Sequence, residues 1–425
     1  MSKNDLSTDP YKGVRDFYPE DWAQMQSVFD TLRTTLHMHG YEEYNASPLE
    51  AAELYESKTS EEIVNEQTFT FSDRGERRVT LRPEMTPTLA RMVAGKRREL
   101  TFPLRWFSLP NLFRYERPQK GRLREHYQLN VDLLGIADEK ADGEIIVIAS
   151  ELLKSFGAFD GDFSIRLNSR ALLNAATSAL GYTAEESKDY LRLLDRKAKM
   201  SAEDFETART PFRKSGMDAL ELILAGTDAA VSSEKQKIDG LIASFATRGM
   251  NNVTFDSSIV RGFDYYTGIV FEIYDTNPEN TRSMFGGGRY DNLVSLFGGE
   301  SIPAVGFGMG DVTLLDFLST HDYLPKTQSA PTLYLGTPGE SDINVAQEFA
   351  TTLREQGNIS VIVHTAGKTL GDQIREATKR NIPYFVAYGQ TEFDTGMLRL
   401  KLLHENFEKE MSSAQLLDLL THLPK

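Results

Sequence analysis

The residues best suited to chemistry lie in residues 259–274, where Arg261, Tyr265 and Tyr266 stand between two glycines. Both flanks are rich in β-branched and aromatic residues, which predicts two strands joined by a bend. A plain hairpin turn needs only Gly, Asn or Asp, so an arginine and two tyrosines exceed what turn chemistry requires. Two interpretations stay open on these residues alone. The tyrosines cap a core beside a solvated arginine, or the bend presents Arg261 to a ligand.

Two further segments carry residues of the same kind. Residues 104–135 are expected to form a long antiparallel hairpin, with Arg114 on its first strand and a cation-rich loop at residues 116–124. Residues 81–87 contain two prolines, which are expected to keep the chain extended so that Glu84 and Thr86 point to the same side. This pair is either an acceptor set for a ligand ammonium group or a fortuitous feature of an irregular loop.

Two of these motifs resemble those of one family. Residues 261–268 read Arg-Gly-Phe-Asp-Tyr-Tyr-Thr-Gly and resemble the histidine-specific motif of histidyl-tRNA synthetases. Residues 114–122 resemble the second motif of class II aminoacyl-tRNA synthetases in its histidyl form. The resemblance implies an ATP-dependent ligase that forms histidyl-adenylate, releases pyrophosphate and transfers histidine to the 3′ end of tRNA(His).

The resemblance also implies roles for the amino-acid side of the site. Glu84, Thr86 and Gln128 would hold the α-amino group of L-histidine, with Tyr265 beside them, and Asp132 and Tyr266 would hydrogen-bond its imidazole. Such a set is chemically coherent, because a carboxylate and a phenol can satisfy both ring nitrogens. Many bacterial relatives carry Glu where this chain has Asp132.

On the ATP side, the attack of a carboxylate on the α-phosphate must be met by fixed cations. Arg114 and Arg261 are expected to contact that phosphate, since the planar guanidinium stays charged and binds pairs of oxygens. ATP binding is also assigned to Glu116 and Arg122, with Glu116 as a ligand for Mg²⁺. Gln119 matches the position that relatives use near the tRNA acceptor end.

One position departs from the class II pattern. The third motif, a strand followed by a helix, usually carries an arginine that stacks on adenine and contacts the γ-phosphate, but Thr313 stands at that place. Another cation, such as Arg122 or Arg289, would cover the triphosphate, or magnesium would carry more of the charge, or ATP binding is altered.

Composition limits the class of protein. With 425 residues, 40% hydrophobic and 26% charged, the chain is expected to be a soluble protein of two or three domains. It contains no cysteine, so disulfides, thiolate zinc sites and cysteine nucleophiles are excluded. No apolar run approaches the length of a membrane span, and the N-terminus lacks the apolar core of a signal peptide, which predicts a cytoplasmic protein without a membrane anchor. The net charge of -15 argues against non-specific nucleic-acid binding.

The elements that position these residues predict an α+β fold. Residues 1–325 are expected to form a class II catalytic domain on an antiparallel sheet, with a helical insertion at residues 170–250. Residues 285–291 are expected to be a tight glycine turn. Residues 304–310 are expected to be a glycine-rich strand that a planar base can approach. Their spacing excludes a dinucleotide-binding fingerprint, because position 311 is Asp.

Residues 331–425 are expected to form a separate domain. Short apolar runs alternate with helical patterns there, which predicts a small α/β domain with a largely parallel sheet. It resembles the anticodon-binding domain of class II synthetases, and the family further implies a homodimer. The alternative is a non-catalytic synthetase-like paralogue, such as the regulatory subunit of ATP phosphoribosyltransferase. The absent motif-three arginine favours the paralogue, whereas the retained Arg261 motif and the last domain favour the ligase.

Overall fold

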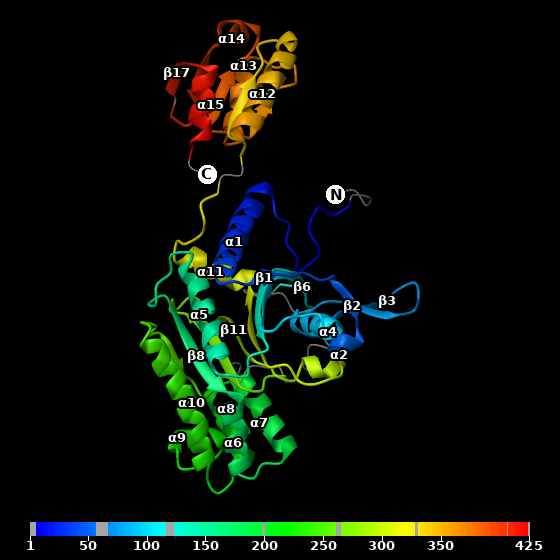
Figure 1. Ribbon diagram of the computed structural model, residues 1–425, viewed down its shortest axis with the longest axis vertical. Helices are drawn as coiled ribbons and strands as arrows, with labels where there is room; N and C mark the ends of the chain where they lie inside the picture. Colours follow the sequence, from blue (N-terminus) through cyan, green and yellow to red (C-terminus); the bar gives the residue numbers. More distant parts are fainter. Residues whose placement is uncertain are drawn as a thin grey trace. The chain divides into compact units, whose positions relative to one another are not determined.

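The computed structural model describes residues 6–56, 67–115, 123–197, 200–260, 265–327, 330–405 and 407–423. The chain forms two compact units, a larger one that includes Gln24–Pro325 and a smaller one that includes Lys326–Lys425 (Figure 1). Each unit has a hydrophobic core of its own. No helix among the described residues is both long and apolar enough to cross a membrane.

The larger unit is built on a nine-stranded sheet. Its strands are β1 (Glu42–Glu43), β5 (Leu104–Ser108), β6 (Asn111–Phe113), β7 (Glu125–Leu134), β8 (Phe163–Ser169), β9 (Val253–Phe255), β10 (Ile269–Asp275), β11 (Ser283–Arg289) and β12 (Ala304–Gly310). They follow the order β1-β5-β7-β12-β11-β10-β8-β9, and β6 pairs with β7. Every pair from β5 to β8 in this order is antiparallel, whereas β1 and β9 join the edges in parallel. The sheet is therefore antiparallel where its central strands lie side by side.

Helices pack on both faces of this sheet. One face carries the main core, to which α1 (Pro19–Met38), α5 (Lys140–Lys154) and α11 (Asp311–Thr320) contribute together with Leu129, Val131 and Leu133 of β7. The other face carries a smaller core that contains residues of α4 (Thr86–Lys96) and the two tyrosines Tyr265 and Tyr266. Because side chains alternate along a strand, the even-numbered residues of β7 face this second side.

A small antiparallel sheet forms separately from the large one. It consists of three strands in the order β2 (Leu49–Ala51), β4 (Arg78–Leu81) and β3 (Phe69–Ser72). The short helix α2 (Glu53–Glu56) follows β2 in the sequence, and the 3-10 helix η3 (Val294–Phe297) lies between β11 and β12 in the sequence. The sequence of residues 41–50 also favours one continuous strand, and this interpretation is wrong, since β1 and β2 belong to different sheets. Pro48 lies between them, and proline lacks the N–H that a continuous ladder requires.

Between β8 and β9 the described chain is almost entirely helical (Figure 1). The helices are α6 (Arg170–Ala179), α7 (Ala184–Arg196), α8 (Ala202–Arg209), η2 (Thr210–Phe212), α9 (Ala219–Ala225) and α10 (Ala229–Ala246). The side chain of Thr183 accepts from the N–H of Glu186, whose own side chain closes the capping box, and Ser201 caps α8 in a similar way. These polar caps fix where the helices begin.

Two expectations about the centre of the chain are wrong. Residues 259 and 260 are not a strand; Ile259 and Val260 are buried in a loop, and the side-chain amide of Asn168 donates to the carbonyl of Ile259 at 2.7 Å. Residues 283–289, with the three consecutive glycines, form strand β11 rather than a turn. Packing and partner contacts override local propensity at both places.

The smaller unit has a mixed five-stranded sheet in the order β14-β13-β15-β16-β17. Its strands are β13 (Leu333–Gly336), β14 (Val361–Val363), β15 (Tyr384–Ala387), β16 (Met397–Leu402) and β17 (Phe407–Ser412), and its helices are η4 (Glu340–Asp342), α12 (Ile343–Gly357), α13 (Leu370–Lys379), α14 (Gln390–Thr395) and α15 (Ser413–Thr421). The apolar runs at residues 332–335, 360–363 and 384–387, which the sequence predicts as strands, correspond to β13, β14 and β15, and these pair in parallel, as predicted. The antiparallel pairs β15–β16 and β16–β17 were not expected, so the sheet is only partly parallel.

Candidate active site

The residues expected to bind an amino acid line one cavity of about 150 Å³. It lies on the α4 side of the large sheet, and the predicted residues on its wall are Glu84, Thr86, Arg114, Gln128, Asp132, Tyr265 and Tyr266. Asn130, Gly286, Tyr290, Gly306, Phe307 and Gly308 complete the wall and were not predicted as site residues. Segments that are far apart in the sequence therefore meet around a single space.

Strand β7 supplies one side of the cavity through its even-numbered residues. Gln128, Asn130 and Asp132 line the space, whereas the intervening residues Leu129 and Val131 are buried in the main core on the opposite face. This arrangement follows from the two-residue period of a strand. Asn130 could have been found from the same alternation, because it lies between two predicted site residues on one face.

Glycines of the two neighbouring strands make room for these side chains. A Cβ atom at Gly306 would lie 2.3 Å from Oδ1 of Asp132, and one at Gly308 would lie 2.6 Å from the amide nitrogen of Gln128. At Gly288 of β11 it would lie 2.9 Å from the ring of Tyr266. The glycines of β12 were expected to let a base approach the backbone, but the groups that approach in the structure are site side chains of the chain itself.

We expect a methyl group at Gly306 to disturb the amino-acid cavity. Gly306→Ala places a carbon against Asp132 and also 2.6 Å from the carbonyl of Val131, so Asp132 must move. Histidine affinity, measured by calorimetry, should fall at least about tenfold, the order of one lost charge-assisted hydrogen bond. Gly310→Ala is the matched control, because the closest contact of its added carbon is 3.9 Å away, at Thr313. Equal affinities in the two variants would contradict this role of Gly306.

Asp132 is a strongly perturbed carboxylate of the cavity. Its side chain is buried, and Oδ1 accepts a hydrogen bond from the hydroxyl of Tyr290. Burial raises the pKa of Asp132 to about 7, against the lowering effect of that hydrogen bond. Oδ2 is buried and has no hydrogen-bond partner in the described part of the chain. A buried acceptor without a partner is costly, so Oδ2 is suited to accept from a ligand N–H.

Tyr290 was missed as a site residue because it was placed in a glycine turn. It is buried, and burial followed by the charge of Asp132 raises the pKa of its phenol well above the usual value. Tyr290 therefore stays protonated and donates to Asp132. The signal that could have found it is the run Gly-Gly-Gly-Arg-Tyr-Asp at residues 286–291, where a tyrosine directly follows a strand that approaches its neighbours closely.

Glu84 and Thr86 approach the cavity from the start of α4. Glu84 is buried, and its Oε2 accepts from the hydroxyl of Tyr265 at 3.2 Å, while Tyr55 donates to its backbone carbonyl. The extended segment expected here ends early, because Thr86 is already the first residue of α4 and Pro87 occupies the favoured first turn. Both side chains nevertheless line the same space.

Arg114 lies at the other end of the cavity from Asp132 along β7. Its Nε donates to the carbonyl of Pro83 at 2.9 Å, which fixes the side chain beside Glu84. His126 lies on β7 two residues before Gln128. Burial and the charges of Arg114 and Arg15 lower its pKa to about 3. His126 is thus neutral at physiological pH and leaves the positive charge of this end to the arginines.

Several predicted site residues lie outside the described residues, namely Arg261, Glu116, Gln119 and Arg122. Among the residues that the structure does describe, no three acidic or histidine side chains are grouped so that they could hold a metal ion. The described residues nearest to Arg261 in the sequence are Val260 and Tyr265; both are buried, and Tyr265 lines the cavity.

Thr313 stands where the third class II motif usually has an arginine, and Arg289 was a possible replacement for it. Both side chains form hydrogen bonds within the fold. Thr313 lies in the first turn of α11 and donates to the carbonyl of Met284 at 2.6 Å. Arg289, considered above as a replacement cation, is 7% exposed and donates to both carboxylate oxygens of Asp142 on α5, with further bonds to the carbonyls of Ile136 and Asp138. Its guanidinium is used within the fold, so Arg289 is excluded as the cation that covers a triphosphate.

Comparison with known proteins identifies the family. A family model described as "Histidyl-tRNA synthetase" matches residues 13–313, and one described as "Anticodon binding domain" matches residues 334–423. The chain is 41% identical over 94% of its length to "Histidine--tRNA ligase" of Leptospira biflexa, of which it also covers 94%, and 36% identical to that of Natronomonas pharaonis, with 92% and 93% covered. Histidyl-tRNA synthetase of a Nostoc species shares the fold, with a TM-score of 0.76, 22% identity and coverage of 97% of this chain and 99% of that one. The predicted α+β class II architecture and the resemblance drawn from the motifs are confirmed: this chain belongs to the histidyl-tRNA synthetase family.

Proposed function

We propose that the protein is a histidine–tRNA ligase that activates L-histidine with ATP, releases pyrophosphate and transfers histidine to the 3′ end of tRNA(His). The observation that carries this proposal is the cavity that Glu84, Gln128 and Arg114 line together with the buried Asp132, whose Oδ2 has no hydrogen-bond partner among the described residues. Relatives named histidine–tRNA ligases match over nearly the whole chain, which favours the ligase over the regulatory paralogue.

The amino-acid side of the site follows from the chemistry of its wall. Glu84, Thr86 and Gln128 would hold the ammonium group, while Asp132 and Tyr266 would bond the two imidazole nitrogens. Support comes from the free Oδ2 of Asp132 and from the pairing of Glu84 with Tyr265, which orients its carboxylate. An apolar side chain of similar size would leave these buried polar groups unpaired, so the site would reject it strongly.

The phosphate side would use cations from two segments. Arg114 and Arg261 would contact the α-phosphate as the histidine carboxylate oxygen bonds to phosphorus and pyrophosphate leaves. Glu116 and Arg122 would hold ATP, and Glu116 would ligate Mg²⁺, whose charge would offset that of the phosphates. Gln119 would contact the acceptor end of the tRNA. The carboxylates suit magnesium, which prefers oxygen ligands, and the chain offers no thiolate that would favour a softer metal.

The parts of the chain that meet RNA would be the smaller unit and the helical segment of the larger one. We assign residues 1–325 to the catalytic domain, residues 170–250 to an insertion in it and residues 331–425 to anticodon binding. The match of residues 334–423 to an anticodon-binding family model supports the last assignment. Residues 96–98 are three consecutive cations that the sequence offers as a strip for RNA phosphates. They support RNA contact poorly, because Lys96 and Arg97 lie within ion-pair distance of Glu99 and Glu300.

Removal of the smaller unit should separate the two half-reactions. A chain that ends after Leu324 retains the main hydrophobic core and every described residue of the cavity, so histidine-dependent pyrophosphate exchange should continue. Charging of tRNA should fall, since the contact far from the acceptor end is lost. The measurement is exchange and aminoacylation on the same preparation. Unchanged charging would show that residues 331–425 do not read the tRNA.

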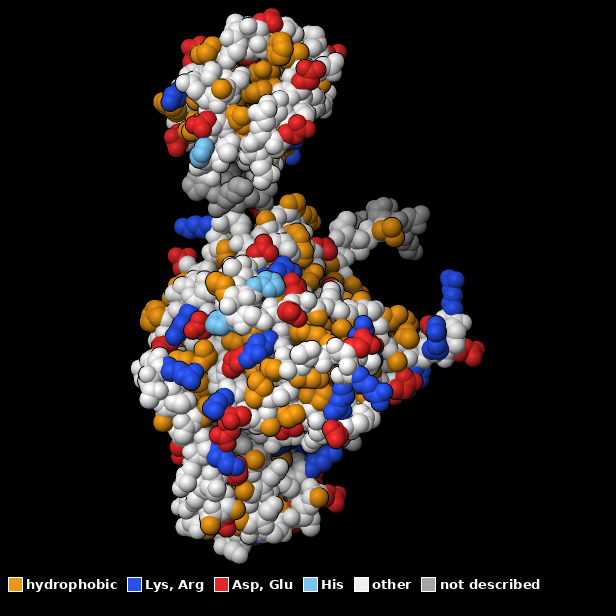
Figure 2. Space-filling view, viewed as in Figure 1, with side chains coloured by type: hydrophobic (Ala, Val, Ile, Leu, Met, Phe, Trp, Pro, Cys, Tyr) orange, Lys and Arg blue, Asp and Glu red, His pale blue; other side chains and the backbone are white. Residues whose placement is uncertain are grey.

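We also propose a homodimer in the cytoplasm. Hydrophobic side chains are scattered over the surface of the larger unit (Figure 2). Two of them, Leu49 and Phe71, belong to the small antiparallel sheet and are 44% and 49% exposed. A second copy of the chain would remove such side chains from water. Sedimentation equilibrium would separate a dimer from a monomer.

The first test of function is histidine-dependent exchange of labelled pyrophosphate into ATP, with magnesium and without tRNA. Exchange with histidine and with no other amino acid would establish activation and show that Thr313 is tolerated. If the protein binds histidine but does not exchange, the non-catalytic paralogue becomes the better description and the absent arginine its cause.

A further inference from the structure

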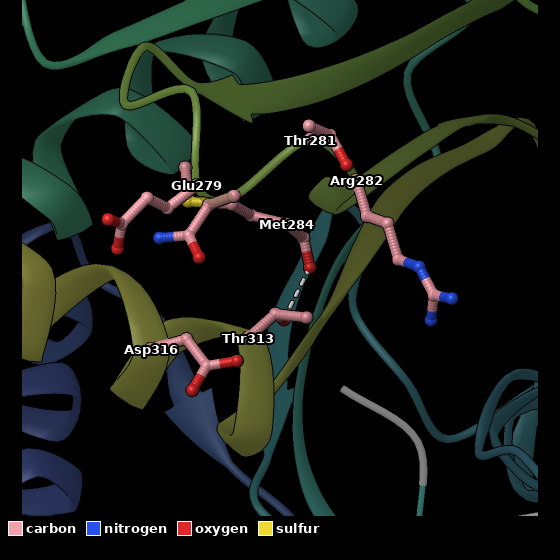
Figure 3. Close-up of a pocket in the computed structure, with 7 residues that line it drawn as sticks. Glu279, Thr281, Arg282, Met284, Thr313 and Asp316 are labelled. Atoms are coloured by element: carbon pink, nitrogen blue, oxygen red, sulfur yellow. Dashed lines mark hydrogen bonds between the residues drawn. The ribbon is translucent and has the colours of Figure 1, made fainter. Parts of the chain in front are cut away.

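Buried polar atoms that lack a hydrogen-bond partner gather beside Asp132 rather than at the second cavity of the larger unit. That cavity has a volume of about 160 Å³ and is lined by Glu279, Asn280, Thr281, Arg282, Met284, Thr313 and Asp316. None of these residues carries a buried side-chain N or O atom that the described part of the chain leaves unpaired; Thr313, for example, donates to the carbonyl of Met284 (Figure 3). In contrast, the hydroxyls of Tyr44 and Ser108 and Oδ2 of Asp132 are buried without a partner among the described residues.

The strands place Ser108 on the same face of the large sheet as Asp132. In the antiparallel pair of β5 with β7, Ser108 is paired with Asn130. Residues directly opposite each other in such a pair carry their side chains on one face, and Asn130 and Asp132 both line the amino-acid cavity. Phe107, the residue before Ser108, is buried in the main core on the opposite face, as alternation along a strand requires. The hydroxyl of Ser108 therefore lies on the cavity side of the sheet.

Tyr44 reaches the same place from the edge of the sheet. It follows β1, which runs parallel to β5, and its backbone N–H donates to the carbonyl of Phe107 at 2.8 Å. Its ring packs against Trp106, with 5.6 Å between the ring centroids, and belongs to the smaller core on the cavity side. Burial, followed by the charge of Asp132, raises the pKa of its phenol well above the usual value, whereas Ser108 acts in the opposite direction. The phenol of Tyr44 is therefore close to both of the other groups.

Neither hydroxyl lies on the wall of the amino-acid cavity. That wall includes Asp132 but not Tyr44 or Ser108, so an amino acid in the cavity would meet the carboxylate and leave both hydroxyls buried without a partner. Such unpaired groups are costly inside a protein. A buried water satisfies them well, because it typically forms about three hydrogen bonds to polar groups that lack other partners.

We propose that Tyr44 and Ser108 bind a water molecule together with Oδ2 of Asp132, and that this water holds the carboxylate in place for the imidazole of histidine. This inference rests on the proposed function. The water accepts from the two hydroxyls and donates to Oδ2, while Tyr290 donates to Oδ1. An ionised carboxylate oxygen has two acceptor sites, so Oδ2 can also take the imidazole N–H.

The consequence is a restricted carboxylate. With a donor on each oxygen, Asp132 cannot rotate without breaking a hydrogen bond, and its second acceptor site on Oδ2 stays directed at the cavity. Tyr44 and Ser108 are thus positioning residues, which act on the substrate through Asp132.

A crystal structure of the ligand-free protein tests the water site directly. We expect an ordered water within about 2.5–3.2 Å of the three oxygen atoms in the wild-type protein, and we expect the double variant Tyr44→Phe, Ser108→Ala to lack it. Electron density without this water, or a direct hydrogen bond from Tyr44 to Asp132, would overturn the inference. Because the observation does not depend on histidine, a protein that holds the water but does not bind histidine would support the water site and contradict the proposed function.

Histidine affinity tests the positioning role. Tyr44→Phe and Ser108→Ala should each weaken histidine binding about 3- to 10-fold in calorimetric titration, the range for one net hydrogen bond. The kcat of pyrophosphate exchange and the KM for ATP should stay unchanged. In the Asp132→Asn background the same two changes should have no further effect, because the carboxylate that the water holds is absent. A merely structural role of the hydroxyls would lower histidine affinity in both backgrounds.

Two matched controls remove hydroxyls elsewhere. Ser150→Ala deletes a buried serine hydroxyl that also lacks a partner in the described part of the chain, but Ser150 lies on α5, on the opposite face of the sheet. Tyr323→Phe deletes a hydroxyl that donates to Asp162 at 2.9 Å, from a tyrosine packed against the main core. Both controls should bind histidine as the wild type does. Affinities of Tyr44→Phe and Ser108→Ala equal to those of the controls would remove Tyr44 and Ser108 from histidine recognition.

Discussion

Arg261→His abolishes adenylate formation while the fold and histidine binding stay nearly intact. This is the expected result if Arg261 meets charge that develops on the α-phosphate, because a group used only in the transition state affects the rate and not ground-state binding. Loss of one such preorganised donor lowers a rate on the order of 10²- to 10³-fold. Pyrophosphate exchange measures the rate, and calorimetric titration with histidine measures the binding.

The amino-acid cavity supports this separation of effects. All contacts proposed for the histidine side chain and ammonium come from other residues, among them Glu84, Gln128 and Asp132. Arg248→His is the control for the change of residue type, since Arg248 is exposed in the segment between β8 and β9. Near-normal exchange by Arg261→His would remove that residue from the mechanism. A joint loss of exchange and histidine binding would assign it to ground-state binding instead.

The sequence predicted the site best where a single strand carries several of its residues. Alternation along residues 125–134 puts Gln128 and Asp132 on one face, and the structure places both on the cavity wall. Tyr290 and the glycines could not be found in this way. Glycine has low strand propensity, so three in a row predict a turn. Only the three-dimensional structure explains these glycines, because Asp132 and Tyr266 occupy the space that a Cβ atom at Gly306 or Gly288 would need.

The fold was predicted more completely than its local details. Helical spacing of apolar residues over 22–36 and 142–156 predicts two helices, and apolar patterns at 78–81 and 384–387 predict two strands. These correspond to α1, α5, β4 and β15 of the structure. Ile259 and Val260 were assigned to a strand because they are β-branched, whereas the structure buries them in a loop that Asn168 holds. The pairing of β16 with β17 depends on contacts between segments, which local patterns do not specify.

Asp132→Asn is expected to have opposite effects on stability and on binding. The pKa of Asp132, about 7 in the fold, exceeds the 3.8 of an unperturbed aspartate. The folded state therefore holds a proton that the unfolded state releases as pH rises between these values, and stability is lost over that window. At about 1.4 kcal/mol per pKa unit, the ionised carboxylate costs the ligand-free fold on the order of 4 kcal/mol above pH 7 and nothing below pH 4. An amide does not titrate, so Asp132→Asn should raise the melting temperature relative to wild type more at pH 8 than at pH 5.

Histidine binding should change in the other direction, because the same carboxylate is the proposed partner of the imidazole. Oδ1 already accepts from Tyr290, so a proton taken up by Asp132 is placed on Oδ2 and converts the free acceptor into a donor. Histidine affinity of the wild-type protein should rise as pH increases through about 7, the pKa of Asp132, whereas Asp132→Asn should bind weakly without this dependence. Tyr290→Phe keeps the carboxylate but removes a hydrogen bond that lowers its pKa, so its affinity curve should shift to higher pH. A wild-type affinity that stays constant from pH 6 to pH 8, after correction for the titration of free histidine, would separate Asp132 from imidazole recognition.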